Sequence, residues 1–128
     1  MIKKILLDTN FLLIPAQFNI DIFSEIDKLM LAKYKLFTLD KIIGELESIQ
    51  KDKKQKLKNK NAAKLALQLL KAKKVNIVKT KENKPVDDIL VILKEYIIAT
   101  QDIDLKNRLK AKKVKIITLR AKKKLIMT

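Results

Sequence analysis

The segment Ile5-Leu6-Leu7-Asp8-Thr9-Asn10 begins with three apolar residues and ends with three polar ones. Its apolar run predicts a buried strand over residues 3–7. The polar residues then lie at the carboxyl end of that strand, which is the edge where a parallel α/β sheet gathers its functional groups. This one segment therefore indicates both a fold class and the place of a site.

Alternating elements follow along the rest of the chain. Strands are predicted over residues 34–39, 75–78, 95–100 and 114–119. Helical spacing of apolar residues predicts helices over residues 21–33, 40–49, 61–73, 85–94 and 102–110. This order implies a three-layer α/β/α sandwich around a mainly parallel, five-stranded sheet. We expect a single domain over residues 1–128, with a basic tail from about residue 120.

Several residue types are absent or rare in the chain, which limits the catalytic and metal-binding groups that it can use. The chain has no Cys and no His, so disulfides, cysteine nucleophiles and the commonest zinc ligand are excluded. Its one glycine, Gly44, cannot build a phosphate-binding loop or a dinucleotide fingerprint. No apolar run is long enough to span a membrane, so we expect a cytoplasmic protein without a membrane partner. Any chemistry must use carboxylates, hydroxyls, lysines and bound ions.

Basic charge is concentrated in the second part of the chain. Residues 1–50 hold 6 basic and 7 acidic groups, whereas residues 51–128 hold 24 and 7, a net charge of +17. This asymmetry favours a polyanion such as a nucleic acid, because a thermophile surface would be enriched in Glu together with Lys. The run 51–60 predicts a solvated helix extension or a mobile connector. Its candidate RNA-binding residues are Lys53, Lys54, Lys56, Lys58 and Lys60.

Five acids stand at the ends or on the faces of predicted elements. They are Asp8, Glu45, Asp87, Asp102 and Asp104. Acids that converge repel one another unless a cation joins them. Oxygen ligands without His or Cys fit hard cations, Mg²⁺ or Mn²⁺. The pattern therefore predicts a divalent-metal site, from which phosphodiester hydrolysis follows as the leading hypothesis.

The strand ends supply the firmest candidates. Asp8 and Asp102 follow two strands that are neighbours in a doubly wound sheet, so we expect both at one edge. Asp8 could instead cap the helix that follows it, and Asp104 could cap the helix that follows Asp102. Asn10 and Thr100 are expected as auxiliary groups that orient water or a carboxylate.

Two pairs of acids lie on predicted helices, Glu45 with Glu47 and Asp87 with Asp88. Glu45 borders the apolar stripe of its helix, whereas Glu47 lies on the far side and is expected to be solvated. Asp87 and Asp88 both begin a helix, where acids are favourable in any case. Periodicity does not choose between these last two.

Four segments in this order resemble the PIN-domain family, and the resemblance covers nearly the whole chain. They are Ile5–Asn10, Ile42–Leu46, Val86–Leu90 and Ile98–Leu105, and Lys115–Arg120 also resembles the last strand of archaeal members. The family implies a Mg²⁺- or Mn²⁺-dependent endoribonuclease.

By match with the family's motifs, the resemblance implies two sets of roles. The catalytic cluster is Asp8, Glu45, Asp87 and Asp102. The metal ligands are Asp8, Asp87, Asp102 and, as an auxiliary acid, Asp104. One departure is Gln101, which stands where many members have Asn.

Other hypotheses remain beside the enzyme. The chain could be a catalytically silent PIN-like RNA-binding module in rRNA processing or ribosome assembly, or a toxin-type PIN ribonuclease. A phosphoryl-transfer receiver domain is disfavoured, because Lys79 and Thr80 follow the third strand where that domain needs an Asp. The family also suggests a homodimer and a protein partner. With no Trp, recognition of RNA is expected to rely on backbone and shape.

Overall fold

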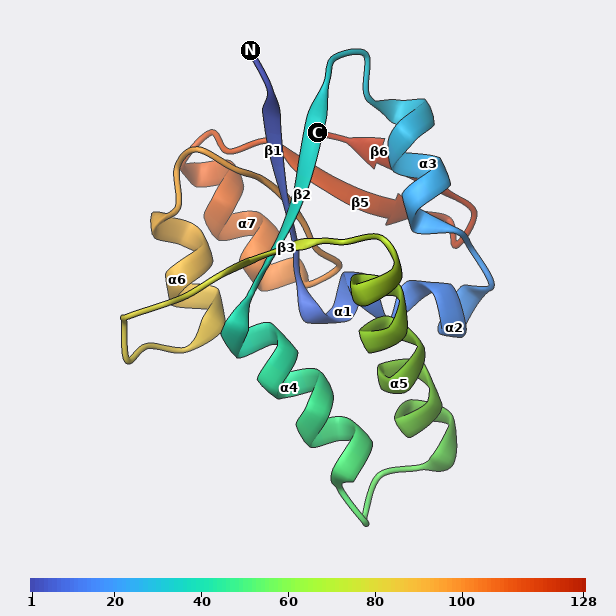
Figure 1. The fold of residues 1–128 in the computed structure, drawn as a ribbon. Helices are drawn as coiled ribbons and strands as arrows, with labels where there is room; N and C mark the ends of the chain where they lie inside the picture. Colours follow the sequence, from blue (N-terminus) through green and yellow to red (C-terminus); the bar gives the residue numbers. More distant parts are fainter.

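Six strands form one sheet in the order β3-β2-β1-β4-β5-β6 (Figure 1). They are β1 (Lys3–Leu7), β2 (Tyr34–Leu39), β3 (Asn76–Val78), β4 (Ile97–Ala99), β5 (Ile116–Arg120) and β6 (Lys124–Met127). The computed structural model describes residues 1–128. The first five strands run parallel, and β6 alone pairs antiparallel, with β5. The sheet is thus mainly parallel, as predicted.

The prediction of five strands and a basic tail from about residue 120 is wrong at the chain end. β5 and β6 form a hairpin in which Leu119 pairs with Leu125. Ala121 and Lys122 in the turn have positive φ values of 54° and 56°. Tight hairpin turns with such φ angles usually contain Asn or Gly, which are absent here. The sequence therefore lacks the usual hairpin signal.

Seven helices cover the sheet. They are α1 (Thr9–Leu12), α2 (Ile14–Phe18), α3 (Ile22–Leu29), α4 (Asp40–Lys51), α5 (Leu57–Ala72), α6 (Val86–Ile92) and α7 (Ile103–Ala111). Connections that step from β1 toward β3 and connections that step back toward β5 must put their helices on opposite faces, because parallel crossovers are right-handed. Figure 1 accordingly shows α6 and α7 together on one side of the sheet and α2, α3 and α5 on the other.

The lysine-rich run 51–60 is part turn and part helix. Helix α4 ends at Lys51 and α5 begins at Leu57, so the two helices form a hairpin that projects below the sheet in Figure 1. The two helices pack against each other, and Leu46 of α4 and Ala63 and Ala66 of α5 are buried. None of the seven helices combines the length and apolar character that crossing a membrane requires.

The core fixes where the first strand ends. Ile5, Leu6 and Leu7 are completely buried at the centre of the sheet. The buried Thr38 hydroxyl donates a hydrogen bond to the Leu7 carbonyl at 2.9 Å, so β2 holds the last residue of β1. The neighbouring β4 then aligns Ala99 with Leu7. The residues that follow these two strands must emerge side by side.

Candidate active site at the carboxyl edge of the sheet

Asp8 is the buried centre of this edge. Its side chain is 4% exposed, just beyond the end of β1. One carboxylate oxygen accepts a hydrogen bond from the Thr9 backbone N–H at 2.8 Å, and the other accepts one from the Thr100 hydroxyl at 2.8 Å. The Asp8 backbone N–H also donates to the Ala99 carbonyl at 2.9 Å. Strands β1 and β4 are neighbours, as predicted, and they place Asp8 and Thr100 in contact.

Amide side chains fix the loop that follows β4. The Asn10 Oδ1 accepts a hydrogen bond from the Gln101 backbone N–H at 2.9 Å and lies 3.2 Å from the Thr100 hydroxyl. The Gln101 Oε1 in turn accepts from the Thr118 hydroxyl at 2.7 Å and from the Leu119 N–H at 2.6 Å. Gln101 thus connects this loop to β5, a role for the residue that departs from the family pattern.

Glu45 reaches the edge from helix α4. Its Oε1 accepts a hydrogen bond from the Thr9 hydroxyl at 3.0 Å. Partial burial raises the pKa of Glu45, and the negative charge of Asp87 raises it further, against the lowering effect of the Thr9 hydrogen bond. Two acids from distant parts of the sequence are therefore close enough here for the charge of one to act on the other.

The neighbouring acids Asp87 and Asp88 have different surroundings. Asp88 forms an ion pair with Arg108 of α7, with 2.9 Å between Nη2 and Oδ1. Asp87 has no ion pair, and burial followed by the negative charge of Asp102 raises its pKa, with Arg108 acting in the opposite direction. Asp87 therefore lies among the other acids, while Asp88 has a basic partner of its own.

Asp102 caps helix α7, and Asp104 does not. The Asp102 Oδ1 accepts a hydrogen bond from the Leu105 N–H at 3.0 Å, whereas its Oδ2 accepts none. Asp104 lies exposed in the first turn of α7. The alternative in which Asp104 caps the helix does not hold, because Asp102 occupies the cap position. One oxygen of Asp102 is left for another partner.

Asp40 shows what an acid with a structural role looks like at the same edge. It follows β2 as the first residue of α4, and the cap itself is Leu39. The Asp40 Oδ1 accepts hydrogen bonds from the Thr80 hydroxyl and the Lys41 N–H, both at 2.8 Å. These bonds, the Thr80 hydroxyl first, hold the pKa of Asp40 below its ordinary value. The pKa values of Asp8, Glu45 and Asp87 are instead raised above their ordinary values.

Mutual repulsion connects the remaining acids. Burial raises the pKa of Asp8 to about 6, hydrogen bonds from Thr100 and Thr9 oppose this rise, and the charges of Asp87 and Glu45 add to it. The two ion pairs in the structure are Lys28–Glu25 and Arg108–Asp88. None of the four acids Asp8, Glu45, Asp87 and Asp102 therefore forms an ion pair, in a chain of net charge +16. We call these four residues the acidic edge.

The donor chemistry of the acidic edge fits a hard divalent cation. All its donors are carboxylate, hydroxyl or amide oxygens, and a cation would relieve the repulsion among the acids. No three of the acids lie close enough together to enclose an ion by themselves. Mg²⁺ is commonly held by one or two carboxylates together with waters and phosphate oxygens, and such a site needs no protein cage.

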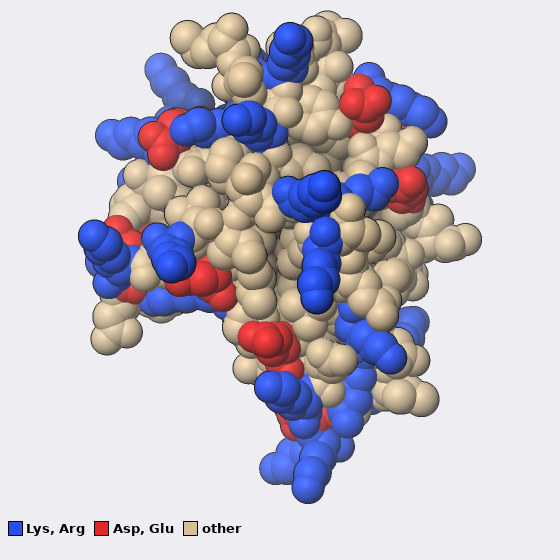
Figure 2. Space-filling model, viewed as in Figure 1, with Lys and Arg blue, Asp and Glu red and all other residues tan.

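The candidate RNA-binding lysines lie elsewhere. Lys53, Lys54, Lys56, Lys58 and Lys60 occupy the turn between α4 and α5 and the start of α5, all exposed except the half-buried Lys60. Figure 2 shows basic side chains covering this tip, while acidic side chains over α6 and along α4 border a recess. The structure thus places these lysines beyond the C-terminal end of α4, whereas Glu45 lies in the middle of that helix.

Three contributors to the acidic edge escaped the sequence analysis as side chains with roles. Thr9 holds Glu45, Gln101 holds the loop after β4, and Arg108 pairs with Asp88. Arg108 carried a usable signal, since the chain contains just two Arg among 30 basic residues. Arginine is the residue preferred for specific ion pairs with carboxylates. Thr9 and Gln101 depend on contacts between distant segments, which no local pattern encodes.

Comparison with known proteins agrees with this fold. A family model described as PIN like domain matches residues 5–122, so the chain belongs to the PIN-like domain family. Ribonuclease VapC4 of Methanocaldococcus jannaschii is 34% identical over 123 residues, which cover 94% of this chain and 92% of that protein.

Solved structures share the fold. The PIN domain endonuclease Utp24 superimposes with a TM-score of 0.78 at 24% identity, over 97% of this chain and 90% of that one. A domain of a functionally unknown protein from Methanocaldococcus jannaschii gives a TM-score of 0.64 at 18% identity, over 93% and 92% of the two chains.

The pKa of Asp8 leads to a prediction about stability. Because this pKa rises from 3.8 to about 6 on folding, stability is highest below pH 4 for this group and is lost as pH rises through 6. In metal-free buffer at pH 8, Asp8→Asn should therefore raise the free energy of unfolding by about 1–3 kcal/mol. The gain should vanish near pH 4. Urea unfolding of both proteins across this pH range measures it.

The same pair of proteins contains a control. Mn²⁺ should stabilise the wild type more than Asp8→Asn, since a ligand of the folded state raises stability. A destabilised Asp8→Asn protein at pH 8 without metal would contradict the account of a buried carboxylate whose negative charge is unfavourable.

Proposed function

We propose that this protein is a Mg²⁺- or Mn²⁺-dependent endoribonuclease. The observation that carries the proposal is the acidic edge, four acids of which none forms an ion pair. The name of the related Ribonuclease VapC4, 34% identical over 94% of this chain, supports RNA as the substrate.

Each acid has a distinct part in this proposal. Asp8, Asp87 and Asp102 hold the cation, with the exposed Asp104 as an auxiliary ligand, and Glu45 completes the catalytic set. A bound cation acidifies a water molecule and neutralises charge on the phosphate. The protein's own contribution is orientation, which costs nothing at the moment of reaction when the groups are already held.

Hydroxyl and amide groups supply that orientation. Thr100 holds one oxygen of Asp8 at 2.8 Å, and Thr9 holds Glu45 at 3.0 Å. Asn10 fixes the loop that begins with Gln101, so that Asp102 starts α7 at a defined place. Raised pKa values of buried acids are common in active sites, because unfavourable burial is retained where function needs it.

Lysines bind the RNA backbone in this proposal. The α4–α5 tip carries Lys53, Lys54, Lys56 and Lys58 in exposed positions, at the end of the helix that also carries Glu45. RNA that contacts the tip can therefore extend along α4 toward the acidic edge. Phosphate contacts of this kind supply affinity without sequence preference.

Cleavage of a labelled structured RNA with Mn²⁺ tests the enzyme proposal. We expect the wild type to cut it, and Asp8→Asn or Asp87→Asn to lower the rate by about 100-fold, equivalent to about 3 kcal/mol in the barrier. Circular dichroism would establish that the variants remain folded.

Matched controls are available beside each acid. Glu47→Gln removes an exposed acid from the same helix as Glu45, and Asp88→Asn removes the neighbour of Asp87. Both variants should keep most of the activity. If the wild type binds RNA with steep salt dependence but never cuts it, the silent RNA-binding module replaces the enzyme.

The α4–α5 tip gives a separate prediction on binding. Replacing Lys53, Lys54, Lys56 and Lys58 by Ala should lower the slope of log affinity against log salt by about 3, since each lost phosphate contact removes about 0.7. Filter binding at several salt concentrations measures the slope. The quadruple Ala variant of Lys3, Lys94, Lys112 and Lys115 loses the same charge from the opposite end of the sheet, and it should keep the wild-type slope. Equal losses in the two variants would mean that net charge, and not the tip, binds RNA.

A further inference from the structure

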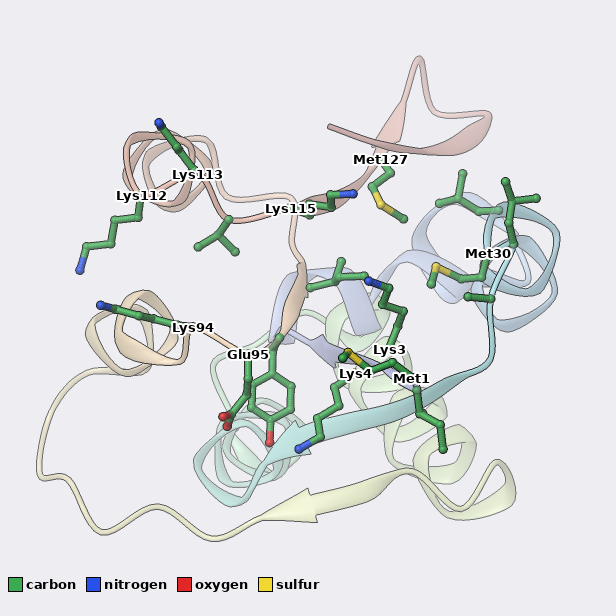
Figure 3. Close-up of a pocket in the computed structure, with 17 residues that line it drawn as sticks. Met1, Lys3, Lys4, Met30, Lys94, Glu95, Lys112, Lys113, Lys115 and Met127 are labelled. Carbon is green, nitrogen blue, oxygen red and sulfur yellow. The ribbon is translucent and has the colours of Figure 1, made fainter.

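A groove of about 1070 Å³ opens at the end of the sheet opposite the acidic edge. Its lining comes from the starts of parallel strands, where Lys3 and Lys4 begin β1, Ile97 begins β4 and Lys115 precedes β5. The turn after α3, residues 30–32, completes it (Figure 3). Because active sites of parallel sheets lie at the carboxyl edge, this groove is separate from the proposed catalytic site.

The floor of the groove is apolar. Ten of its 17 lining residues are hydrophobic. Figure 3 shows Met30 and Met127 on one side of it, from α3's end and from β6. Leu31 and Met1 are fully exposed, and Ile2 is half exposed. A contiguous apolar surface of this kind in water marks a place where another molecule binds.

The rim of the groove is basic. Six lysines line it, against the single acid Glu95: Lys3, Lys4, Lys94, Lys112, Lys113 and Lys115. Neither ion pair of the structure includes any of them. Lys4 alone has an intramolecular role, with its ammonium 5.7 Å from the Tyr96 ring centroid and 5.9 Å from that of Phe37. Figure 3 places Lys94, Lys112 and Lys113 together on the side facing away from the two methionines.

We propose that this groove docks an amphipathic, acidic segment of another protein. Apolar side chains of the segment cover the floor by Met30 and Leu31, and its carboxylates face Lys94 and Lys112. Complementary charge at the rim steers such a partner and fixes its orientation, while burial of apolar surface supplies affinity. The inference does not depend on RNA cleavage, since none of the groove residues belongs to the acidic edge.

Other occupants match the groove less well. A second copy of this chain would bring identical patches together across a twofold axis, so the six lysines would face six more. An RNA backbone would satisfy the lysines but would leave the apolar floor in water, because nucleic-acid interfaces are polar. A flat lipid surface would contact the projecting side chains of Met1 and Leu31 but would not fill the groove behind them.

A designed peptide tests the proposal. The probe is a fluorescein-labelled peptide of about 16 residues, long enough for a helix to form, with Leu on one face and Glu on the other. We expect it to bind the wild-type chain, and Leu31→Asp to weaken binding by about tenfold or more. The double variant Lys94→Glu, Lys112→Glu should do the same. All of these side chains are exposed, so the variants should fold.

Matched controls separate docking from attraction between net charges. A scrambled peptide of equal composition should bind at least tenfold more weakly, because it lacks an apolar face. The variant Lys53→Glu, Lys54→Glu makes the same charge change at the α4–α5 tip and should keep the wild-type affinity for the peptide.

Four results would overturn the proposal. They are equal binding of the scrambled peptide, equal loss of affinity in the tip variant, a wild-type dimer in sedimentation that Leu31→Asp dissociates, and binding to phosphatidylserine vesicles, but not to the peptide, that Leu31→Asp removes. RNA cleavage by the Leu31→Asp variant should equal that of the wild type, so failure of this proposal and failure of the enzyme proposal can be told apart.

Discussion

The hydrogen bond from the Thr100 hydroxyl to the buried carboxylate of Asp8 is the constraint on which the candidate site depends. It joins two completely or nearly buried polar groups at 2.8 Å, at the ends of neighbouring strands. A buried carboxylate costs free energy unless its oxygens are paired or a cation is near. Thr9 and Thr100 donate hydrogen bonds to the two carboxylate oxygens, but no basic side chain balances the negative charge. The free-energy cost of burying this charge raises the pKa of Asp8 to about 6. Selection for stability alone would therefore replace Asp8 by an uncharged residue.

The two ends of the sheet differ in chemistry because of its topology. At the carboxyl end, strands β1 and β4 and helices α4, α6 and α7 bring four acids together, although the chain as a whole is strongly basic. At the amino end, lysines surround an apolar groove. A parallel sheet separates these ends by the length of its strands, so a partner bound at the groove leaves the acidic edge accessible.

Much of this arrangement follows from sequence, for reasons that depend on the element. The Ile5–Leu7 run predicts the central strand, and the polar residues after it predict the functional edge of the sheet. Both features depend on residues that are neighbours in the sequence, so a local pattern reveals them. Contacts between distant segments leave none, so the bond from Thr9 to Glu45 and the pairing of Arg108 with Asp88 had to come from the structure. The β5–β6 hairpin was missed because Ala121 and Lys122 occupy turn positions that usually hold Asn or Gly.

The central claim is that the acidic edge holds a divalent cation. Paramagnetic Mn²⁺ broadens the NMR signals of nearby nuclei, so titrating it into ¹⁵N-labelled protein locates the ion directly. The account predicts early loss of the amide signals of residues 8–10, 87–88 and 100–104, while those of the groove around Leu31 and of the α4–α5 tip persist. Broadening that begins elsewhere, or signals at Asp8 and Asp102 that survive saturating Mn²⁺, would contradict it.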